Sequence, residues 1–319
     1  MNSHDRAAME AFFAQVDEKG VSNAEKAGTR HHVIRRVATT SKDKSYEDAD
    51  EALDNRAEGL PIGVVEVDGK LVGLGIHILN EDVYPLQSFE IYLRGCDLVG
   101  HLDVSGCTDM VFLDLYRNRV SSICVADMPA MRILGLQGNE ISALDPTELP
   151  ACQGIDIGMN RLEAIDVSRN PELVELYVND NRLTSLDTSR NAKLKYLRLQ
   201  NNGISELDTT GNPLLRHLYA TGNPLSSVRA WAPGDEGGRP LVLTAAEGGH
   251  VGLSFNPIYN AQWKETGEWE QSYHAYATEG FAFAGWYDEA GELVSSEADW
   301  MDEYGTSRVL EARFLQEQC

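Results

Sequence analysis

Two consecutive stretches decide the fold: LVELYVNDNRLTSLDTSRNAK at Leu173–Lys193 and LKYLRLQNNGISELDTTGNPL at Leu194–Leu214. Both follow the template L-x-x-L-x-L-x-x-N-x-L-x-x-L-D-x-S-x-N-P-x. The Asn at the ninth position recurs with a 21-residue period, at Asn118, Asn139, Asn160, Asn181, Asn202 and Asn223. A fixed period of this length outweighs local propensity and predicts a solenoid of stacked coils, each of which buries the apolar side of its neighbour.

The template positions have different physical tasks. The L-x-L piece alternates with period two and predicts a short strand with inward leucines, and the stacked coils then form a parallel sheet. The Asn lies where the chain leaves that strand, and its amide can satisfy backbone groups of the turn. An Asp column predicts the return turn, which is too short and too polar for a long helix. This column contains Asp103, Asp145, Asp166, Asp187 and Asp208.

The spacing resembles the short, 21-residue class of bacterial leucine-rich repeats, similar to those of internalin-like surface proteins, from about Phe89 to Val228. The resemblance implies a leucine-rich repeat solenoid of parallel β-coils with non-helical returns, about seven coils over residues 89–231. Two departures occur. Ile91, Leu93 and Leu102 fit the first unit only with an insertion, and Cys124 replaces the Asp of its column.

The N-terminal segment, residues 1–88, mixes helical and hairpin patterns. Apolar residues at helical spacing predict a helix from Ser3 to about Lys19, and a second helix over Asn23–Arg36 is expected. Asp68-Gly69 between two β-branched runs predicts a hairpin. A solenoid exposes its core at its first coil, so we interpret residues 1–88 as an α/β cap. A separate small recognition domain is the alternative.

After the repeats, residues 232–240 have the composition of a linker, and residues 241–319 are β-rich. Strands are expected at Leu241–Thr244, Val251–Phe255, Tyr273–Thr278, Phe281–Trp286 and Val309–Phe314. The segments ATEGFAFAGWYDEAGELVS and RVLEARF resemble a divergent internalin-type B repeat, through Gly280, Phe281, Phe283, Gly285, Trp286, Leu310, Ala312 and Phe314. That resemblance implies a small, β-grasp-like domain of the kind found beside leucine-rich repeats in bacterial surface proteins.

The charge balance limits the partners. The chain has 319 residues and a net charge of −23, which argues against nucleic acid and anionic membranes. It contains no apolar run long enough for membrane insertion, and the segment from Met1 to Arg30 lacks a secretory pattern. Taken literally, this describes a cytoplasmic protein. The family resemblance instead favours a secreted or cell-surface protein, and both locations stay open.

No metal or cofactor site is predicted. The cysteines have no C-x-x-C spacing and are interpreted as buried structural thiols, with a Cys96–Cys107 disulfide as the alternative. Calcium near Asp299, Asp302 and Glu303 is weighed against a solvated acidic face, since residues 241–319 hold fourteen Asp or Glu against three Lys or Arg. Catalytic motifs are absent, so the chain is expected not to be an enzyme.

The repeat offers a surface instead, because side chains on either side of each inward leucine project from the same sheet. In the last coils these positions gather aromatic and basic residues, flanked by acidic ones. The predicted ligand-binding residues are Tyr177, Tyr196, Arg198, His217, Tyr219, Glu175 and Asp156. Tyr and Arg dominate binding at many interfaces, although rings on adjacent strands also stabilise a sheet by covering each other.

Two functions follow from this surface. The first is a non-enzymatic recognition module that binds a basic or mixed-charge protein, or else a glycan, through the repeat sheet. The second is an intracellular structural scaffold without a dedicated ligand.

Overall fold

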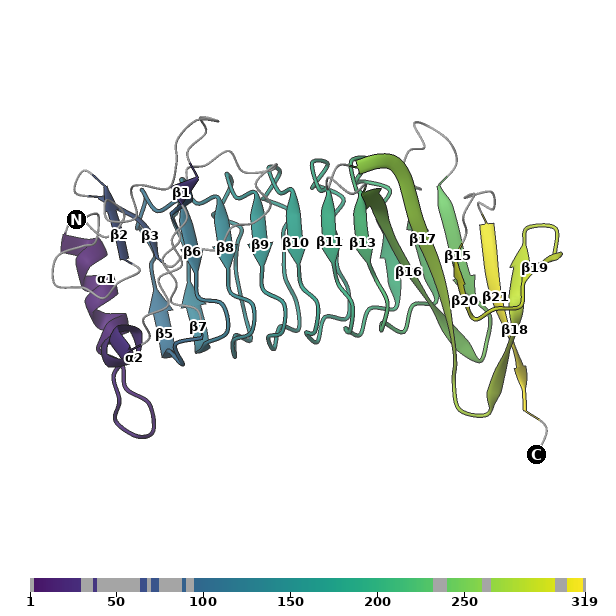
Figure 1. The fold of residues 1–319 in the computed structure, drawn as a ribbon, viewed down its shortest axis with the longest axis horizontal. Coiled ribbons are helices and arrows are strands. Elements are labelled where there is room, and N and C mark those ends of the chain that lie inside the picture. Colours follow the sequence, from purple (N-terminus) through teal and green to yellow (C-terminus); the bar gives the residue numbers. More distant parts are fainter. Residues whose placement is uncertain are drawn as a thin grey trace. The chain divides into compact units, whose positions relative to one another are not determined.

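The computed structural model describes residues 3–29, 37–38, 64–67, 70–74, 88–89, 95–231, 240–259, 265–301 and 309–317. The chain divides into two compact units, Met1–Val174 and Glu175–Cys319, which are described separately below. Both contain coils of the 21-residue repeat (Figure 1).

The first unit begins with two helices and continues into coils. The helices are α1 (Ser3–Phe13) and α2 (Asn23–Thr29). The strands are β1 (Val37–Ala38), β2 (Val64–Val67), β3 (Lys70–Leu74), β4 (Ser88–Phe89), β5 (Val99–Asp103), β6 (Phe112–Asp114), β7 (Arg119–Cys124), β8 (Ile133–Gly135) and β9 (Gly154–Asp156). β2 and β3 form the predicted antiparallel hairpin, and β3, β6, β8 and β9 are parallel neighbours. β5 pairs in parallel with β7.

The second unit contains two sheets. The first has the order β10 (Glu175–Tyr177), β11 (Tyr196–Arg198), β13 (His217–Tyr219), β16 (Gly249–Tyr259), β17 (Glu265–Ala277) and β20 (Asp299–Met301). The second has the order β12 (Glu206–Asp208), β14 (Ser227–Ala230), β15 (Leu241–Ala245), β21 (Val309–Gln316), β18 (Phe281–Asp288) and β19 (Leu293–Ser295).

The inward leucine column forms the core of the coils, as predicted. Within each unit, consecutive coils pair these residues directly, for example Leu113 with Leu134 and Leu176 with Leu197. The whole column is buried: Leu113, Leu134, Ile155, Leu176, Leu197 and Leu218. Short strands separated by non-helical returns make the chain a leucine-rich repeat β-solenoid.

The repeated Asn residues link each coil to the one before it. Their Oδ1 atoms accept backbone N–H groups of the preceding coil at 3.0–3.1 Å, from Leu98, Val120, Ile141, Leu183 and Ile204. Their Nδ2 groups donate to turn carbonyls; Asn139, for instance, reaches the oxygens of Leu115 and Leu136 at 2.9 Å. The predicted role of the Asn column is therefore confirmed.

A second Asn column, not anticipated from the sequence, secures the return side of the coils. Asn170, Asn191 and Asn212 are buried. Asn170 donates to the carbonyls of Pro146 and Leu149 at 2.8 and 2.9 Å. On the same side, the predicted Asp turns are present, because each Asp carboxylate accepts the N–H two residues later; Asp145 does so from Thr147. The Thr147 hydroxyl, which donates to the same carboxylate at 2.7 Å, and the Thr147 N–H hold the pKa of Asp145 below its ordinary value.

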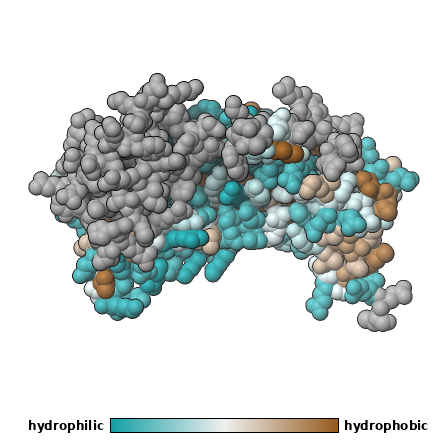
Figure 2. All heavy atoms as spheres, viewed as in Figure 1, coloured by the Kyte–Doolittle hydropathy of each residue, from teal (hydrophilic) through white to brown (hydrophobic). Residues whose placement is uncertain are grey.

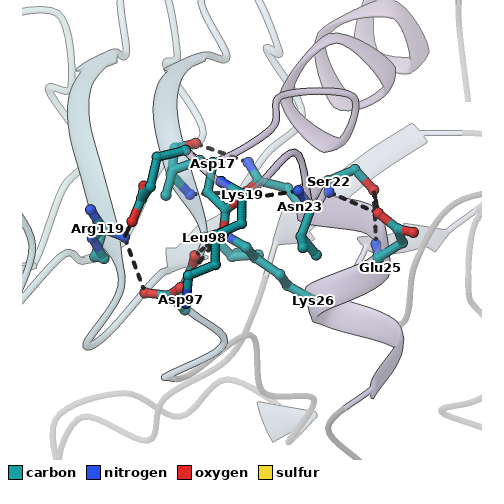
Figure 3. A network of polar contacts seen from close by, with 12 residues as sticks. Asp17, Lys19, Ser22, Asn23, Glu25, Lys26, Asp97, Leu98 and Arg119 are labelled. Atoms are coloured by element: carbon teal, nitrogen blue, oxygen red, sulfur yellow. Dashed lines mark hydrogen bonds and ion pairs between the residues drawn. The ribbon is translucent and has the colours of Figure 1, made fainter.

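Polar side chains attach the N-terminal helices to β5 (Figure 3). The Asn23 amide donates to the carbonyl of Val99 and accepts its N–H, both at 2.9 Å. Gln15 forms the same two bonds with His101, two residues further along the strand. These two amides therefore substitute for a neighbouring strand along β5.

Buried and partly buried charges support the same attachment. Lys26 Nζ lies 3.1 Å from a carboxylate oxygen of Asp17 and 2.7 Å from the carbonyl oxygen of Asp97. Hydrogen bonding by the Val21 N–H, with a further contribution from Lys26, lowers the pKa of Asp17 to about 2. The predicted first helix is shorter than expected, because α1 ends at Phe13. α2 ends at Thr29, and residues 30–36 of the second predicted helix lie outside the described residues.

The C-terminal strands extend both sheets of the second unit. β16 pairs antiparallel with β13, and β15 pairs antiparallel with β14. The five predicted strands correspond to β15, β16, β17, β18 and β21, although the predicted Tyr273–Thr278 extends one residue past the end of β17. β16 and β17 are longer than predicted and pair out to Tyr259 and Glu265. Trp286 is fully buried against Tyr273 and Phe283. Apolar side chains are visible on this part of the surface (Figure 2), where Leu293, Val294, Met301 and Leu315 are exposed.

Candidate ligand-binding surface

Five of the predicted site residues form one group, here called the tyrosine–arginine patch: Tyr177, Tyr196, Arg198, His217 and Tyr219. Parallel pairing places Tyr177, Arg198 and Tyr219 in one row across β10, β11 and β13. Tyr196 and His217 form the next row. The inward leucine of each strand is buried, so these side chains project from the opposite face of the sheet.

Arg198 lies between two aromatic rings. Its guanidinium carbon is 4.7 Å from the centre of the Tyr177 ring and 5.4 Å from that of Tyr219. The two tyrosines belong to the strands on either side of β11, so they approach Arg198 from opposite sides. Arg198 is exposed, while both tyrosines are partly buried.

The second row continues onto β16. The rings of Tyr196 and His217 are stacked with their centres 4.4 Å apart. His217 Nδ1 lies 3.1 Å from Asn256 Oδ1, and His217 Nε2 lies 3.3 Å from the Tyr259 hydroxyl. Asn256 and Tyr259 were not among the predicted site residues. Their position depends on the pairing of β13 with β16, which the 21-residue period does not reveal.

The two predicted acidic residues differ from this group. Glu175 is only 1% exposed, so the expectation that it faces solvent is wrong. Ile133 and Gly154, at the same template position, are buried too. The repeat period determines the face of the sheet from which a side chain projects, but it does not determine whether that side chain is exposed. Asp156 is partly exposed at the end of β9 in the first unit, and it accepts the N–H of Gly158 at 3.3 Å.

A further cluster lies on the same sheet face as Tyr219. Val251, Leu253 and Phe255 are buried, so alternate residues of β16 project with Tyr219, which pairs with Ser254. The cluster consists of His250, His274, Tyr276 and Asp299. It extends the polar and aromatic face across β16, β17 and β20.

Close contacts organise this cluster. The His250 and Tyr276 rings are stacked 5.0 Å apart, and His274 Nδ1 lies 2.8 Å from Asp299 Oδ1. Burial lowers the pKa of His250, while burial and the nearby Asp299 raise the pKa of Tyr276. Both shifts favour the uncharged forms. Asp299, considered above for calcium, is paired with His274; Asp302 and Glu303 lie outside the described residues.

The cysteines behave as buried thiols. Cys96, Cys107 and Cys152 are buried and Cys124 is partly buried; none of these four described cysteines forms a disulfide, so the alternative Cys96–Cys107 bridge is wrong. Burial raises the pKa of Cys152 to about 12. Burial, with a contribution from Asp5, does the same for Cys107. The ligand atoms of His4, Asp5 and Cys107 lie within 4.8 Å of one another. The protonated thiol and its hydrogen bond with Asp5 favour a structural role for this group.

None of the helices in the described residues has the length and apolar character needed to cross a membrane.

Among the comparisons with known proteins, only the comparison with solved structures finds a likeness to this chain. No family model and no curated protein matches the chain. Solved structures with some likeness include the functional domain of InlJ from Listeria monocytogenes, at 18% identity and a TM-score of 0.37, covering 78% of this chain and 58% of that one. The internalin InlF of Listeria monocytogenes has 19% identity and a TM-score of 0.30, covering 38% and 44%.

A leucine-rich repeat protein of Leptospira interrogans has 18% identity and a TM-score of 0.30, covering 41% of this chain and 45% of its own. The chain therefore corresponds to little more than half of the InlJ structure and to less than half of the other two. The assignment of the fold rests on the coils of the chain itself.

Proposed function

We propose that the chain is a non-enzymatic recognition module that binds a mixed-charge polypeptide through the tyrosine–arginine patch. The observation that carries this proposal is the exposed Arg198 between Tyr177 and Tyr219, beside the stacked pair of Tyr196 and His217. Tyr and Arg are the side chains that most often dominate interface energies.

The rigidity of the patch supports binding. Each patch residue lies on a short strand next to a fully buried leucine, and the packing of that leucine in the core fixes the position of the strand backbone. Ring contacts then restrict the side chains above the sheet. A surface that is ordered before binding loses less entropy when a partner arrives.

A secreted or cell-surface location of a bacterial protein belongs to the same proposal, since the repeat and the C-terminal residues resemble internalin-type sequences. An intracellular scaffold without a ligand is the competing function, and in that case the rings would serve only to stabilise the sheet.

The test is a selection of peptides from a random library displayed on phage, with the full chain immobilised. For the selected peptides, Tyr196→Ala and Arg198→Ala should each weaken binding by at least about 2 kcal/mol, which is typical of an interface hot spot. Affinities are measured by calorimetry. Lys193→Ala is the matched control, because Lys193 is exposed in a return turn away from these strands.

Each variant must keep the melting temperature of the parent, so that lost binding is not lost folding. Selected peptides that bind the Tyr196→Ala and Arg198→Ala variants as tightly as the parent would leave the patch with a structural role alone. A glycan array probed in parallel identifies the other ligand class: glycan binding that is lost in the same variants, without selected peptides, would replace the polypeptide in this proposal.

A further inference from the structure

Among the described residues, Arg198 has a charge without a counter-charge. Within that part of the chain it contacts the two tyrosine rings and pairs with no carboxylate. The whole chain has 50 Asp and Glu residues against 27 Lys and Arg residues, so carboxylates are abundant. Arg229 of the same unit, by contrast, lies 3.7 Å from a carboxylate oxygen of Asp208.

The geometry of a guanidinium separates two kinds of contact. Aromatic rings stack on its flat faces, while its N–H donors point outward in the plane, at the edge. A carboxylate binds at that edge through parallel hydrogen bonds. The Arg198 guanidinium carbon lies over both tyrosine rings, and rings that stack on the two faces leave the donors at the edge free.

Arg313 provides an example of the complete arrangement in the same unit. Its guanidinium carbon lies 4.1 Å from the centre of the Tyr287 ring. At the same time its Nε donates to a carboxylate oxygen of Glu311 at 2.6 Å. Arg198 has the rings of such a site, and one ring more, but no carboxylate from the described part of its own chain.

From these contacts we infer that Arg198 is a receptor for a carboxylate group of the polypeptide partner, an Asp or Glu side chain or the chain terminus, with Tyr177 and Tyr219 as its walls. This inference rests on the function proposed above and names the group bound at the centre of the patch. The walls shield the ion pair from water, which strengthens it, and hold the long Arg side chain in place before binding. The net negative charge of the chain attracts the basic groups of a mixed-charge partner.

The first experiment tests the receptor without any partner. Arginine Nε–Hε resonances of the full chain are recorded by NMR during a titration with acetate, and the Arg198 signal is assigned from Arg198→Lys. Acetate should shift this signal saturably, whereas acetamide, its neutral analogue, should not. Arg313 serves as the internal reference, because its edge is already occupied. A signal that does not respond to acetate, or that responds more strongly to phosphate, would overturn the inference.

The second experiment uses the selected peptides. Replacing their acidic residue by the matching amide should weaken binding to the parent at least about tenfold, but less than about twofold in Arg198→Gln, since the carboxylate then has no partner. Arg229→Gln is the control and should keep the full tenfold loss. An equal loss in the parent and in Arg198→Gln would contradict the inference.

The two experiments separate the two proposals. An acetate-responsive Arg198 in a chain that selects no peptide would retain the carboxylate receptor and contradict the recognition of a polypeptide. Peptides that depend on Tyr196 but need no acidic residue would retain the recognition module and contradict the receptor.

Discussion

Strands β6, β8 and β9 of the first unit and strands β10, β11 and β13 of the second are built on the same template but present different faces. The inward residues are nearly identical aliphatics and are buried in both. At the fifth template position, the first unit has Asp114, Gly135 and Asp156, whereas the second has Tyr177, Arg198 and Tyr219. The difference shows that the coil fixes the inward side chains and leaves the face free to carry a ligand site.

Local packing explains part of the contrast. A side chain on Gly135 would have its Cβ 3.2 Å from the Asp114 carboxyl carbon, so the small residue accommodates its neighbour. In the second unit, large rings instead pack beside a long Arg side chain. On each face, neighbouring side chains therefore fit together in size. Substitutions in the core and in the Asn column test whether the coils of the two units are equally stable.

The largest expected effect is on the shared core. Leu134→Ala in the first unit and Leu197→Ala in the second should each lower the free energy of unfolding by about 2–5 kcal/mol, through lost burial and a cavity. Urea denaturation followed by circular dichroism provides the measurement. A loss below about 1 kcal/mol at either position would show that the two sets of coils do not share one kind of core.

The Asn column should give a smaller effect. Asn139→Leu and Asn202→Leu have similar volume but leave backbone groups unsatisfied, at about 1–3 kcal/mol for each buried group. The loss should be larger for Asn139, because it is buried and Asn202 is partly exposed. Denaturation curves for the two variants test this order, and parental stability in both would contradict the role assigned to the column.

The smallest effect concerns the residue before each Asn. The described coils place it in the left-handed region, with φ of 53° at Arg117, 72° at Gly138, 54° at Met159 and 57° at Asn201. Met159 is strained there, so Met159→Gly should raise the free energy of unfolding by about 0.5–1 kcal/mol. Asn201→Gly should change it less, because Asn tolerates this conformation better. Thermal melts of both variants provide the measurement. A lower melting temperature for Met159→Gly than for the parent would contradict the strain assigned to Met159.

Much of the fold could be predicted because residues with the same structural role recur every 21 residues, once in each coil. The inward leucines, the Asn column and the Asp turns all follow from it. The second Asn column has the same period, at Asn170, Asn191 and Asn212, but it lies in the return segment, for which the sequence predicts only a turn. The domain boundaries, including the linker at residues 232–240, remain predictions.

The site could be predicted only where it obeys the period. Tyr177, Arg198 and Tyr219 occupy the same template position in consecutive coils and lie together for that reason. Tyr259 and the histidine cluster reach the same face through antiparallel pairing between distant segments, and such pairing has no periodic signal. The burial of Glu175 has no periodic signal, because the period determines the face from which a side chain projects and not its exposure.

The antiparallel pairing of β16 with β13 also limits how such a protein can change its length during evolution. A further coil must pair in parallel with the last coil strand, but β16 already occupies that edge in the opposite direction. At β5, the amides of Asn23 and Gln15 occupy backbone groups that an added strand would need. Duplication or loss of coils is therefore confined to the interior of the repeat, in steps of one whole coil. Each step changes the number of residues in every row on the face, while the end structures stay unchanged.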